Sequence, residues 1–457
     1  MRLQFLDRDK EIGRLRRALA ADEPAFVVLY GRRRCGKSTL LQQVARSQDV
    51  YFLADRREAP LQIRALAREI ARQVADFNAV EYPSWEALLQ TLNVRAEGDL
   101  CLILDEFPYL VQMAPELPSL LQNFIDRRER KFSLIICGSS QRMMQGLVLD
   151  ASAPLYGRAT EVLKIRPLEP GWIQDALQVE GVQAVEAYGV WGGVPRCWEL
   201  AREFGSQEEG VKELVLDRDG LLNSEPERLL IDDLRSTTQA HSLLSLVANG
   251  CHRLSEVASR LGKPAGSLSR PLAHLIDMGY LRRELPWGES EKSTKRSLYK
   301  LDDPFLRLWY RYVQTNRSLL ERDLVDAVYA DMQRSFSAHV AAVWEDLARE
   351  SAVRLEIAGK RWRPAQRWWG RGLNGKNMEI DLVALSLDGR SLLLGEVKWE
   401  QRTNVGEVIE KLKQGADNFP HIDDREVVLA CWLRQSGGNY GEGESVFVPE
   451  DVIPVLR

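Results

Sequence analysis

Two groups of residues in this chain have the types and spacing that chemistry requires. The first is the segment GRRRCGKST at positions 31–39, which fits the pattern GxxxxGK[ST] in full. In such a loop the backbone N–H groups surround phosphate oxygens, the lysine reaches the β- and γ-phosphates, and the next hydroxyl is a Mg²⁺ ligand. The predicted phosphate-binding residues are Gly31, Arg32, Arg33, Arg34, Cys35, Gly36, Lys37, Ser38 and Thr39.

An acidic pair follows the apolar run at residues 102–104. Asp105 can hold the hydration shell of the Mg²⁺ ion, and Glu106 can polarise a water molecule for attack on the γ-phosphate. The alternative is a strand that ends in two solvated acids. The phosphate loop upstream favours the catalytic interpretation.

Two further side chains are candidates for contact with the transferring phosphate. Ser139 follows the apolar run at 134–136 and can sense the γ-phosphate. An ordinary turn after a strand accounts for a serine at this position nearly as well. Arg158 precedes the strand expected at 162–165 and can stabilise developing charge. A plain surface arginine is the alternative for that residue.

The second chemical group lies near the end of the chain. Asp381 falls in an apolar run at 378–385, and Glu396 and Lys398 fall in the next one, at 391–399. Glu396 and Lys398 point to the same face of a strand because side chains alternate. Beside Asp381 they would place two carboxylates and an ammonium together, a set that binds Mg²⁺ or Mn²⁺ and activates water. An ordinary strand with a Glu-Val-Lys sequence is the alternative.

The elements that must position these residues predict an α/β protein. Continuous apolar strands at 25–30, 102–104, 134–136 and 162–165 alternate with helices, which indicates a parallel sheet covered on both faces. We expect a P-loop domain over residues 1–168, a helical lid over 169–237, a winged helix-turn-helix with a following helix over 238–315, and a small α/β domain over 335–457.

The charge of the chain is uneven along its length. The net charge of the whole chain is −4, but residues 241–300 hold ten basic and five acidic side chains. We expect Ser267, Ser269, Arg270 and His274 on the outer face of a recognition helix and Lys292, Lys295 and Arg296 on the wing, an arrangement that grips DNA. The alternative is an internal packing module.

Arginine and tryptophan alternate between residues 361 and 371, as RWR at 361–363, RWW at 367–369 and Arg371. Such a segment can stack on bases and hold phosphates. It can equally be a loop with its rings in the core and its guanidiniums in solvent.

The composition excludes several classes. The six cysteines form no CxxC pair, so a structural zinc site or a disulfide framework is not expected. Charged residues near position 10 argue against a signal peptide, and no apolar run approaches the ~20 residues of a membrane span. We expect a cytoplasmic protein that does not bind membranes.

The order of motifs in the first 315 residues resembles the archaeal-type ATPases of the STAND group, within the AAA+-related P-loop proteins. The resemblance rests on FLDRDKE at 5–11, GRRRCGKST, LILDEF, CGSS, PLYGRAT and GGVP at 192–195. It implies ATP as the nucleotide, Arg8 and its neighbours near the adenine, a lid that includes 192–195, and slow cycling as a switch. Cys35 departs from the small apolar residue that the family often has, although a thiol is small and apolar as well.

The later group, Asp381 with Glu396 and Lys398, resembles the PD-(D/E)xK nuclease superfamily over about 335–430. Ile380 stands where many members have proline. The resemblance implies a restriction-endonuclease-like fold, with Glu345 as a further metal ligand on the preceding helix and Gln414 at a weaker position. A solvated surface acid is the alternative for Glu345.

Together these features predict an ATP-binding, slowly hydrolysing switch whose nucleotide state controls a winged helix and a nuclease-like domain that act on DNA. A homo-oligomer is compatible with this prediction. The rival prediction is a non-catalytic scaffold in which ATP drives assembly and the last domain only docks DNA or protein.

Overall fold

The computed structural model describes residues 5–97, 99–127, 130–233, 237–290, 292, 296–435 and 445–457. They fall into two compact units. The N-terminal unit comprises Asp7–Pro167 with Ile231–Arg235, and the C-terminal unit comprises Leu168–Leu230 and Ser236–Arg457 with Met1–Leu6.

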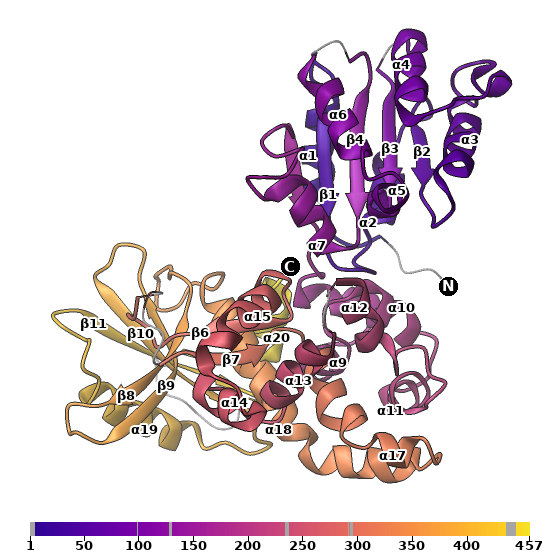
Figure 1. Cartoon of the computed structure of the whole chain (residues 1–457). Coiled ribbons are helices and arrows are strands. Elements are labelled where there is room, and N and C mark those ends of the chain that lie inside the picture. Colours follow the sequence, from indigo (N-terminus) through magenta and orange to yellow (C-terminus); the bar gives the residue numbers. More distant parts are fainter. Residues whose placement is uncertain are drawn as a thin grey trace. The chain divides into compact units, whose positions relative to one another are not determined.

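The N-terminal unit is built on a five-stranded parallel sheet with the strand order β2-β3-β4-β1-β5 (Figure 1). Its strands are β1 (Phe26–Tyr30), β2 (Val50–Leu53), β3 (Cys101–Asp105), β4 (Ser133–Gly138) and β5 (Glu161–Lys164). The predicted parallel sheet is confirmed, and four of these strands match the apolar runs. Strand β2 was missed.

Both faces of this sheet are buried, which explains the continuous apolar runs. Phe26 and Val28 pack on one face with residues of α3 and α4, while Val27 and Leu29 point to the other face and are buried there. The helices of the unit are α1 (Asp9–Leu19), α2 (Lys37–Val44), α3 (Ala59–Ile70), η1 (Phe77–Ala79), α4 (Trp85–Arg95), α5 (Phe107–Met113), α6 (Leu117–Asp126), α7 (Gln141–Met144) and η2 (Gln145–Leu149).

The segment after the sheet is helical, as predicted for the lid. It contains η3 (Pro170–Trp172), α8 (Ile173–Leu177), α9 (Gly181–Trp191), α10 (Pro195–Ala201), α11 (Gln207–Val211), η4 (Lys212–Leu216) and α12 (Glu225–Asp233). Most of it, Leu168–Leu230, clusters with the rest of the C-terminal unit and not with the sheet. Helix α20 (Pro449–Val455) packs against α9, so the last helix of the chain closes onto this segment.

The next elements are three helices and an antiparallel two-stranded hairpin. They are α13 (Thr237–Ala248), α14 (Leu254–Leu261), α15 (Ala265–Asp277), β6 (Leu281–Glu284) and β7 (Leu298–Leu301), followed by α16 (Pro304–Leu308), η5 (Trp309–Gln314) and α17 (Arg317–Leu320). Val257, Leu268 and Leu272 face inward and hold the three helices together. This is the arrangement predicted for a winged helix-turn-helix. Lys295 lies outside the described residues.

A mixed five-stranded sheet, in the order β12-β11-β10-β9-β8, completes the unit. Its strands are β8 (Gln366–Arg371), β9 (Asn377–Leu385), β10 (Ser391–Lys398), β11 (Glu426–Leu433) and β12 (Ser445–Phe447), and its helices are α18 (Val325–Ala352) and α19 (Val405–Asp417). The expected boundary at residue 335 falls inside α18, which is one continuous helix of 28 residues. That boundary is therefore wrong, because the helix packs on β10 with its later turns and on α9 as well.

The segment rich in tryptophan and arginine forms strand β8 and the turn before it. Trp362 and Trp368 are buried in the core, while Trp369 and the nearby arginines are more accessible. Strand β8 pairs with β9 with a register shift, since two steps from Gln366 to Trp368 match three steps from Val383 to Ile380. Strand β9 therefore carries an extra residue, a β-bulge that includes Asp381.

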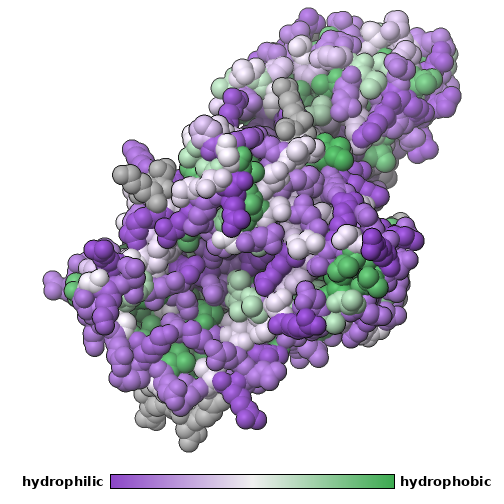
Figure 2. All heavy atoms as spheres, turned by 60° about the horizontal axis from the view of Figure 1, so that its bottom comes forward, coloured by the Kyte–Doolittle hydropathy of each residue, from purple (hydrophilic) through white to green (hydrophobic). Residues whose placement is uncertain are grey.

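The surface offers no membrane-spanning element in the part of the chain that the structure describes. No described helix is both long and apolar enough to cross a bilayer. On the face drawn in Figure 2, hydrophilic residues predominate and the hydrophobic ones form small separate groups.

Candidate functional site

The phosphate loop follows β1 directly and leads into α2. Gly31 has φ 152°, and a Cβ atom there would lie 2.2 Å from the carbonyl oxygen of Ile165, so only glycine fits. Arg34 and Gly36 adopt left-handed conformations with φ 65° and 85°, and Gly36 caps the start of α2. The loop therefore curls over the N-terminus of α2, where backbone N–H groups and the helix dipole favour phosphate.

Lys37 lies at the centre of this loop. Its side chain is buried, and Nζ donates hydrogen bonds of 3.0 Å to the carbonyl oxygens of Gly31 and Arg32. These bonds hold the ammonium group inside the curve of the loop. A phosphate seated there would meet a positive charge at close range.

Arg8 ties the segment before α1 to the phosphate loop. Its guanidinium is buried and donates to the carbonyl oxygens of Cys35, at 3.3 Å, and of Arg166, at 2.6 Å. Arg8 therefore lies at the back of the predicted nucleotide site. Cys35 is fully buried, as expected of a small apolar residue at its position.

Asp105 ends β3 and is held by a residue that the sequence analysis did not select. The Tyr51 hydroxyl donates a 2.5 Å hydrogen bond to Asp105 Oδ2 and also contacts the Ser38 side chain. Burial and the bond to Asp105 raise the pKa of Tyr51, so its phenol keeps its proton. Ser38, Tyr51 and Asp105 thus form one connected group of oxygens, and hydroxyl and carboxylate oxygens fit Mg²⁺.

Glu106 and Ser139 meet in the same region because β4 lies between β1 and β3. Glu106 has φ 55°, an uncommon left-handed conformation for a non-glycine residue, and its backbone N–H donates to Asp105 Oδ1 at 2.9 Å. The Ser139 hydroxyl donates to Glu106 Oε2 at 2.9 Å. The strand order therefore brings the end of β4 to the acidic pair, as predicted.

Arg158 does not join this group. It precedes β5 close to Thr160, whose N–H donates to the carbonyl of Phe26 at the start of β1, whereas the phosphate loop follows the end of β1. Its guanidinium forms two hydrogen bonds, of 2.7 and 2.9 Å, with the Asp126 carboxylate. The full length of a five-residue strand, about 16 Å, separates the two edges, so we assign Arg158 no role at the phosphate of its own chain.

The outer face of α15 matches the expectation for a recognition helix. Ser267, Ser269 and Arg270 are exposed, and His274 is half-buried. The basic residues of the wing are less free to contact DNA, because Arg296 pairs with Glu289 at 2.5 Å. Lys300 and Arg282 of the hairpin turn inward and pair with Glu284.

Asp381 and Glu396 lie on neighbouring antiparallel strands. Leu382 of β9 pairs with Gly395 of β10, so the next step along the two strands leads to Asp381 and Glu396. Asp381 Oδ2 accepts a 3.0 Å hydrogen bond from the backbone N–H of Val397, within the bulge. Glu396 Oε1 is 2.7 Å from Lys398 Nζ and 3.5 Å from Lys411 Nζ. The predicted pair and its lysine therefore share one end of the sheet.

The proximity of these charges shifts their pKa values. Burial, and then the nearby carboxylates of Glu396 and Glu345, raise the pKa of Asp381 to about 6. Burial lowers and the Glu396 carboxylate raises the pKa of Lys398, and the net direction is upward. The nearby carboxylates repel one another when ionised, so a cation bound between them would stabilise their charged forms.

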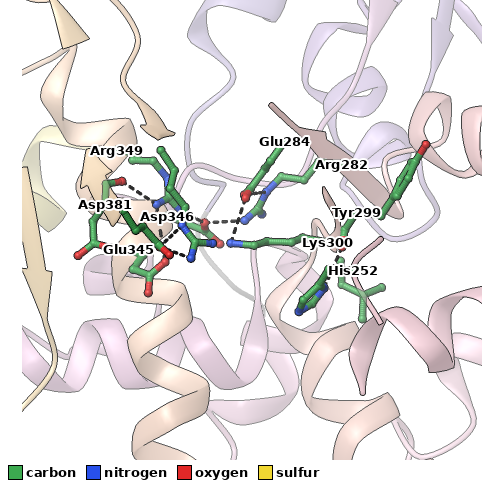
Figure 3. A network of polar contacts seen from close by, with 12 residues as sticks. His252, Arg282, Glu284, Tyr299, Lys300, Glu345, Asp346, Arg349 and Asp381 are labelled. Atoms are coloured by element: carbon green, nitrogen blue, oxygen red, sulfur yellow. Dashed lines mark hydrogen bonds and ion pairs between the residues drawn. The ribbon is translucent and has the colours of Figure 1, made fainter. Parts of the chain in front are cut away.

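Glu345 lies on α18 and contacts a different partner. Its Oε2 is 3.7 Å from Arg349 Nη1, and the same nitrogen donates to the carbonyl oxygen of Asp381 at 3.1 Å (Figure 3). Within the described ranges, no group of three or more His, Cys, Asp or Glu side chains is arranged to hold a metal ion. Glu345 thus does not complete a three-carboxylate cluster, and Asp381 with Glu396 remains the predicted metal pair.

A network of buried ions joins the wing hairpin to this sheet through α18 (Figure 3). Asp346 pairs with Arg282 at 2.5 Å, with Arg349 at 2.6 Å and with Arg307 at 3.3 Å. Burial acts to raise the pKa of Asp346, but the three guanidiniums outweigh it and hold the pKa far below its usual range. The sequence analysis missed this network, because its members are far apart in the chain.

Three segments of the chain match family models. Residues 5–198 match an ATPase domain found predominantly in Archaea, and residues 240–285 match the IclR helix-turn-helix domain. Residues 309–409 match a family of archaeal and bacterial proteins of unknown function. The first two matches confirm the predicted ATPase domain and helix-turn-helix.

The chain is 31% identical over 407 residues to the uncharacterized protein MJECL04 of Methanocaldococcus jannaschii, covering 87% of this chain and 88% of the relative. The chain belongs to the family of this archaeal protein. Its N-terminal unit is the core of an archaeal-type ATPase domain.

Solved structures support the same fold. The Walker-type ATPase of Pyrococcus abyssi is 20% identical and superposes with a TM-score of 0.51, over 67% of this chain and 96% of that chain. A STAND protein with a tetratricopeptide repeat sensor from Pyrococcus horikoshii is 14% identical, with a TM-score of 0.33 over 77% of this chain and 50% of that chain. The second superposition is too loose to carry an argument, so membership of the STAND group stays a prediction.

Proposed function

We propose that this archaeal-type ATPase is a slowly hydrolysing switch, in which the bound nucleotide controls DNA binding by the winged helix and the action of the nuclease-like domain. The observation that carries the proposal is the arrangement of Lys37 at the start of α2 and of Asp105 and Glu106 at the end of β3, on strands that share one sheet edge with the end of β4. Each of these side chains is held by hydrogen bonds that would orient it toward one triphosphate.

The residues of the phosphate site would have separate roles in binding and hydrolysis. Backbone N–H groups of the loop and Lys37 would bind the β- and γ-phosphates, and Ser38 and Asp105 would hold the Mg²⁺ ion. When bound, that ion neutralises charge on the phosphates. Glu106 would accept the proton of the attacking water, and the Ser139 hydroxyl would keep its carboxylate in place.

The DNA part of the proposal rests on α15. Its exposed serines and Arg270, in a segment with a local excess of five positive charges, match the side of a helix that enters the major groove. The test is the affinity of the full chain for duplex DNA with ATP, with ADP and without nucleotide. Equal affinity for DNA in the three nucleotide states would contradict the switch. An absence of DNA binding in all three would contradict DNA as the target.

The nuclease part rests on Asp381, Glu396 and Lys398. Two carboxylates on adjacent strands would hold Mg²⁺ or Mn²⁺, and Lys398 would orient water or neutralise the leaving oxygen. The test is metal-dependent cleavage of plasmid, single-stranded and branched DNA, with and without ATP. Asp381→Ala should abolish the cleavage, while Asp388→Ala, in the exposed turn between β9 and β10, should not. No cleavage of any substrate, or cleavage that survives Asp381→Ala, would contradict the proposal.

One observation favours a second candidate, an ATP-driven scaffold with an inactive nuclease-like fold. Glu396 is already paired with two lysines, and Asp381 already accepts a backbone hydrogen bond. Calorimetric titration with Mn²⁺ separates the two candidates. A binding site lost in Asp381→Ala supports the enzyme, whereas no binding supports the scaffold.

A further inference from the structure

An open groove lies between the winged helix and the edge of the C-terminal sheet, and no residue of α15 is among those that line it. It has a volume of about 840 Å³. Its walls come from three places: Arg253 before α14 with Arg296 of the wing, the edge strand β8 with the start of β9, and the turn after α19. The residues that matter here are Arg253, Arg296, Trp369, Arg371, Asn377 and His421.

The wing is fixed against the strand, so the groove is a built feature of the unit. The backbone N–H of Trp287 donates to the carbonyl of Arg367 at 2.9 Å, and the Trp287 ring packs on Phe419. A Cβ atom on Gly370 would lie 2.7 Å from Arg296 Nη2, which shows how closely the wing approaches β8.

The groove gathers positive charge that the described residues neutralise only in part. Arg371 is exposed, and its side chain has no ion-pair or hydrogen-bond partner among them. Arg253 is 62% exposed on its side chain and pairs only loosely with Glu256, at 3.8 Å. Arg296 uses Nη1 for Glu289, while its Nη2 is buried without a hydrogen-bond partner in the described part of the chain. The one groove acid, Glu379, is paired with Arg367. This charge would favour an anionic ligand.

Aromatic rings accompany these cations on both faces of the edge strand, since Gly370 and Trp368 turn to the face that Arg296 approaches and Trp369 turns to the other. Trp369 shares a face of the sheet with Arg371 and Asn377, because the pairs Trp369–Glu379 and Arg371–Asn377 alternate along the β8–β9 ribbon. The Arg367 guanidinium lies over the Trp369 ring, 5.8 Å from its centroid, and Trp369 is half-exposed at the groove. His421 is exposed at the opposite wall and packs edge-on against Trp368.

We propose that this groove binds single-stranded nucleic acid, with bases stacked on Trp369 and His421 and phosphates held by Arg253, Arg296 and Arg371. Arginines that follow a backbone beside rings that stack on bases are the arrangement of single-strand sites. In a duplex the base faces are covered by one another, so the rings would have no partner. The inference rests on the proposed interaction with DNA and adds a second binding surface that prefers unpaired bases. Glu379, which lines the groove, precedes Asp381 of the candidate metal pair by two residues on β9.

The experiment measures fluorescence anisotropy of the full chain with a labelled oligothymidylate and with a labelled duplex of equal length, in EDTA. Trp369→Ala should weaken single-strand binding about 5- to 100-fold, and Trp369→Phe should restore most of it. Arg371→Ala should reduce the slope of log affinity against log salt by about 0.7. Arg390→Ala, in the exposed turn at the other end of β9, is the matched control and should change nothing.

The outcomes separate this inference from the proposed function. If the Trp369 and Arg371 variants bound single strands with wild-type affinity, the groove would not be the single-strand site. Duplex binding that depends on Arg270 would still support the winged helix as a DNA-binding module. If the wild-type chain bound neither single-stranded nor duplex DNA, both the groove inference and the proposed DNA function would be wrong. Competition by polyglutamate as strong as that by unlabelled oligothymidylate would also overturn the inference, because it would indicate an acidic protein partner.

Discussion

The phosphate site and the carboxylate site are both built at strand ends, yet different forces hold them. In the first, backbone geometry sets the positions: the Gly31 approach to Ile165, the left-handed residues Arg34 and Glu106, and the start of α2. In the second, a bulge in β9 and long-range charges set them, through Arg349 and Asp346. A site fixed by local backbone tolerates changes elsewhere, while a site fixed by remote ions depends on the packing of the whole unit.

The largest effect should follow loss of the central anion of the ion network. Asp346→Ala removes the carboxylate that Arg282, Arg307 and Arg349 share in a mostly buried position, and we expect the free energy of unfolding of the C-terminal unit to fall by about 3–5 kcal/mol. Denaturant unfolding followed by tryptophan fluorescence measures this. ATP affinity should be unchanged. A parallel loss of ATP binding would show that the phosphate site, like the carboxylate site, depends on the ion network.

The same carboxylate makes the C-terminal unit sensitive to acid. The pKa of Asp346 is lower in the folded state than the unfolded value of about 3.9. Its contribution is therefore complete above pH ~4 and is lost as pH falls further, toward the folded pKa. Asp346→Asn should flatten the stability of this unit against pH between about 4 and 2. An unchanged acid profile, measured by circular dichroism, would count against the network.

A large catalytic effect should follow loss of the phosphate-loop ammonium. We expect Lys37→Ala to lower ATP hydrolysis about 10²- to 10³-fold, because one preorganised charge at the phosphates is lost. ATP binding should fall with it, and labelled-nucleotide filter binding measures that. Lys131→Ala, an exposed lysine of the same unit, is the control. Retained ATP binding in Lys37→Ala would show that the loop is not the nucleotide site.

A smaller effect should reveal the role of Tyr51. Tyr51→Phe removes the hydrogen bond to Asp105 without changing the ring, so we expect the Mg²⁺ concentration for half-maximal hydrolysis to rise about 10- to 100-fold. Saturating Mg²⁺ should restore most of the rate. A variant with a lower rate but an unshifted Mg²⁺ requirement would show that Tyr51 only supports packing.

The smallest effect is expected for Arg158. Its ion pair with Asp126 is at the surface and at the far edge of the sheet, and such pairs contribute about 0–1 kcal/mol. Hydrolysis by Arg158→Ala should stay within about twofold of wild type. A large loss would contradict the placement of this residue outside the active site.

The same contrast governs what the sequence could predict. The phosphate loop and the acidic pair Asp105–Glu106 could be predicted as neighbours, because a motif on consecutive residues carries its own geometry, and the structure links Asp105 to Ser38 through Tyr51. Tyr51 was missed since its strand, β2, is short and has only one tyrosine to mark it. A search for a hydroxyl on each strand beside β3 would have found it.

In the C-terminal sheet the prediction identified strands β9 and β10 and the residues on them, but not the details that set their chemistry. The bulge at Asp381, the two lysines on Glu396 and the partner of Glu345 depend on contacts between distant segments. The tryptophan-rich segment was expected as a loop and forms edge strand β8, which buries Trp368 on one face and leaves Arg367, Trp369 and Arg371 on the other.

The closure of α20 onto α9 has a consequence for synthesis of the chain. The parallel sheet is complete by Lys164, so it can form while later residues are still being translated. Segment 168–230 must wait, since Gly171 N–H bonds to the carbonyl of Leu456, and α9 packs against both α18 and α20. At ordinary translation rates the delay is about 15 s to 1 min, during which α9 exposes the apolar face that α18 and α20 later cover. Chaperones that bind nascent chains should therefore protect the middle of this protein rather than its beginning.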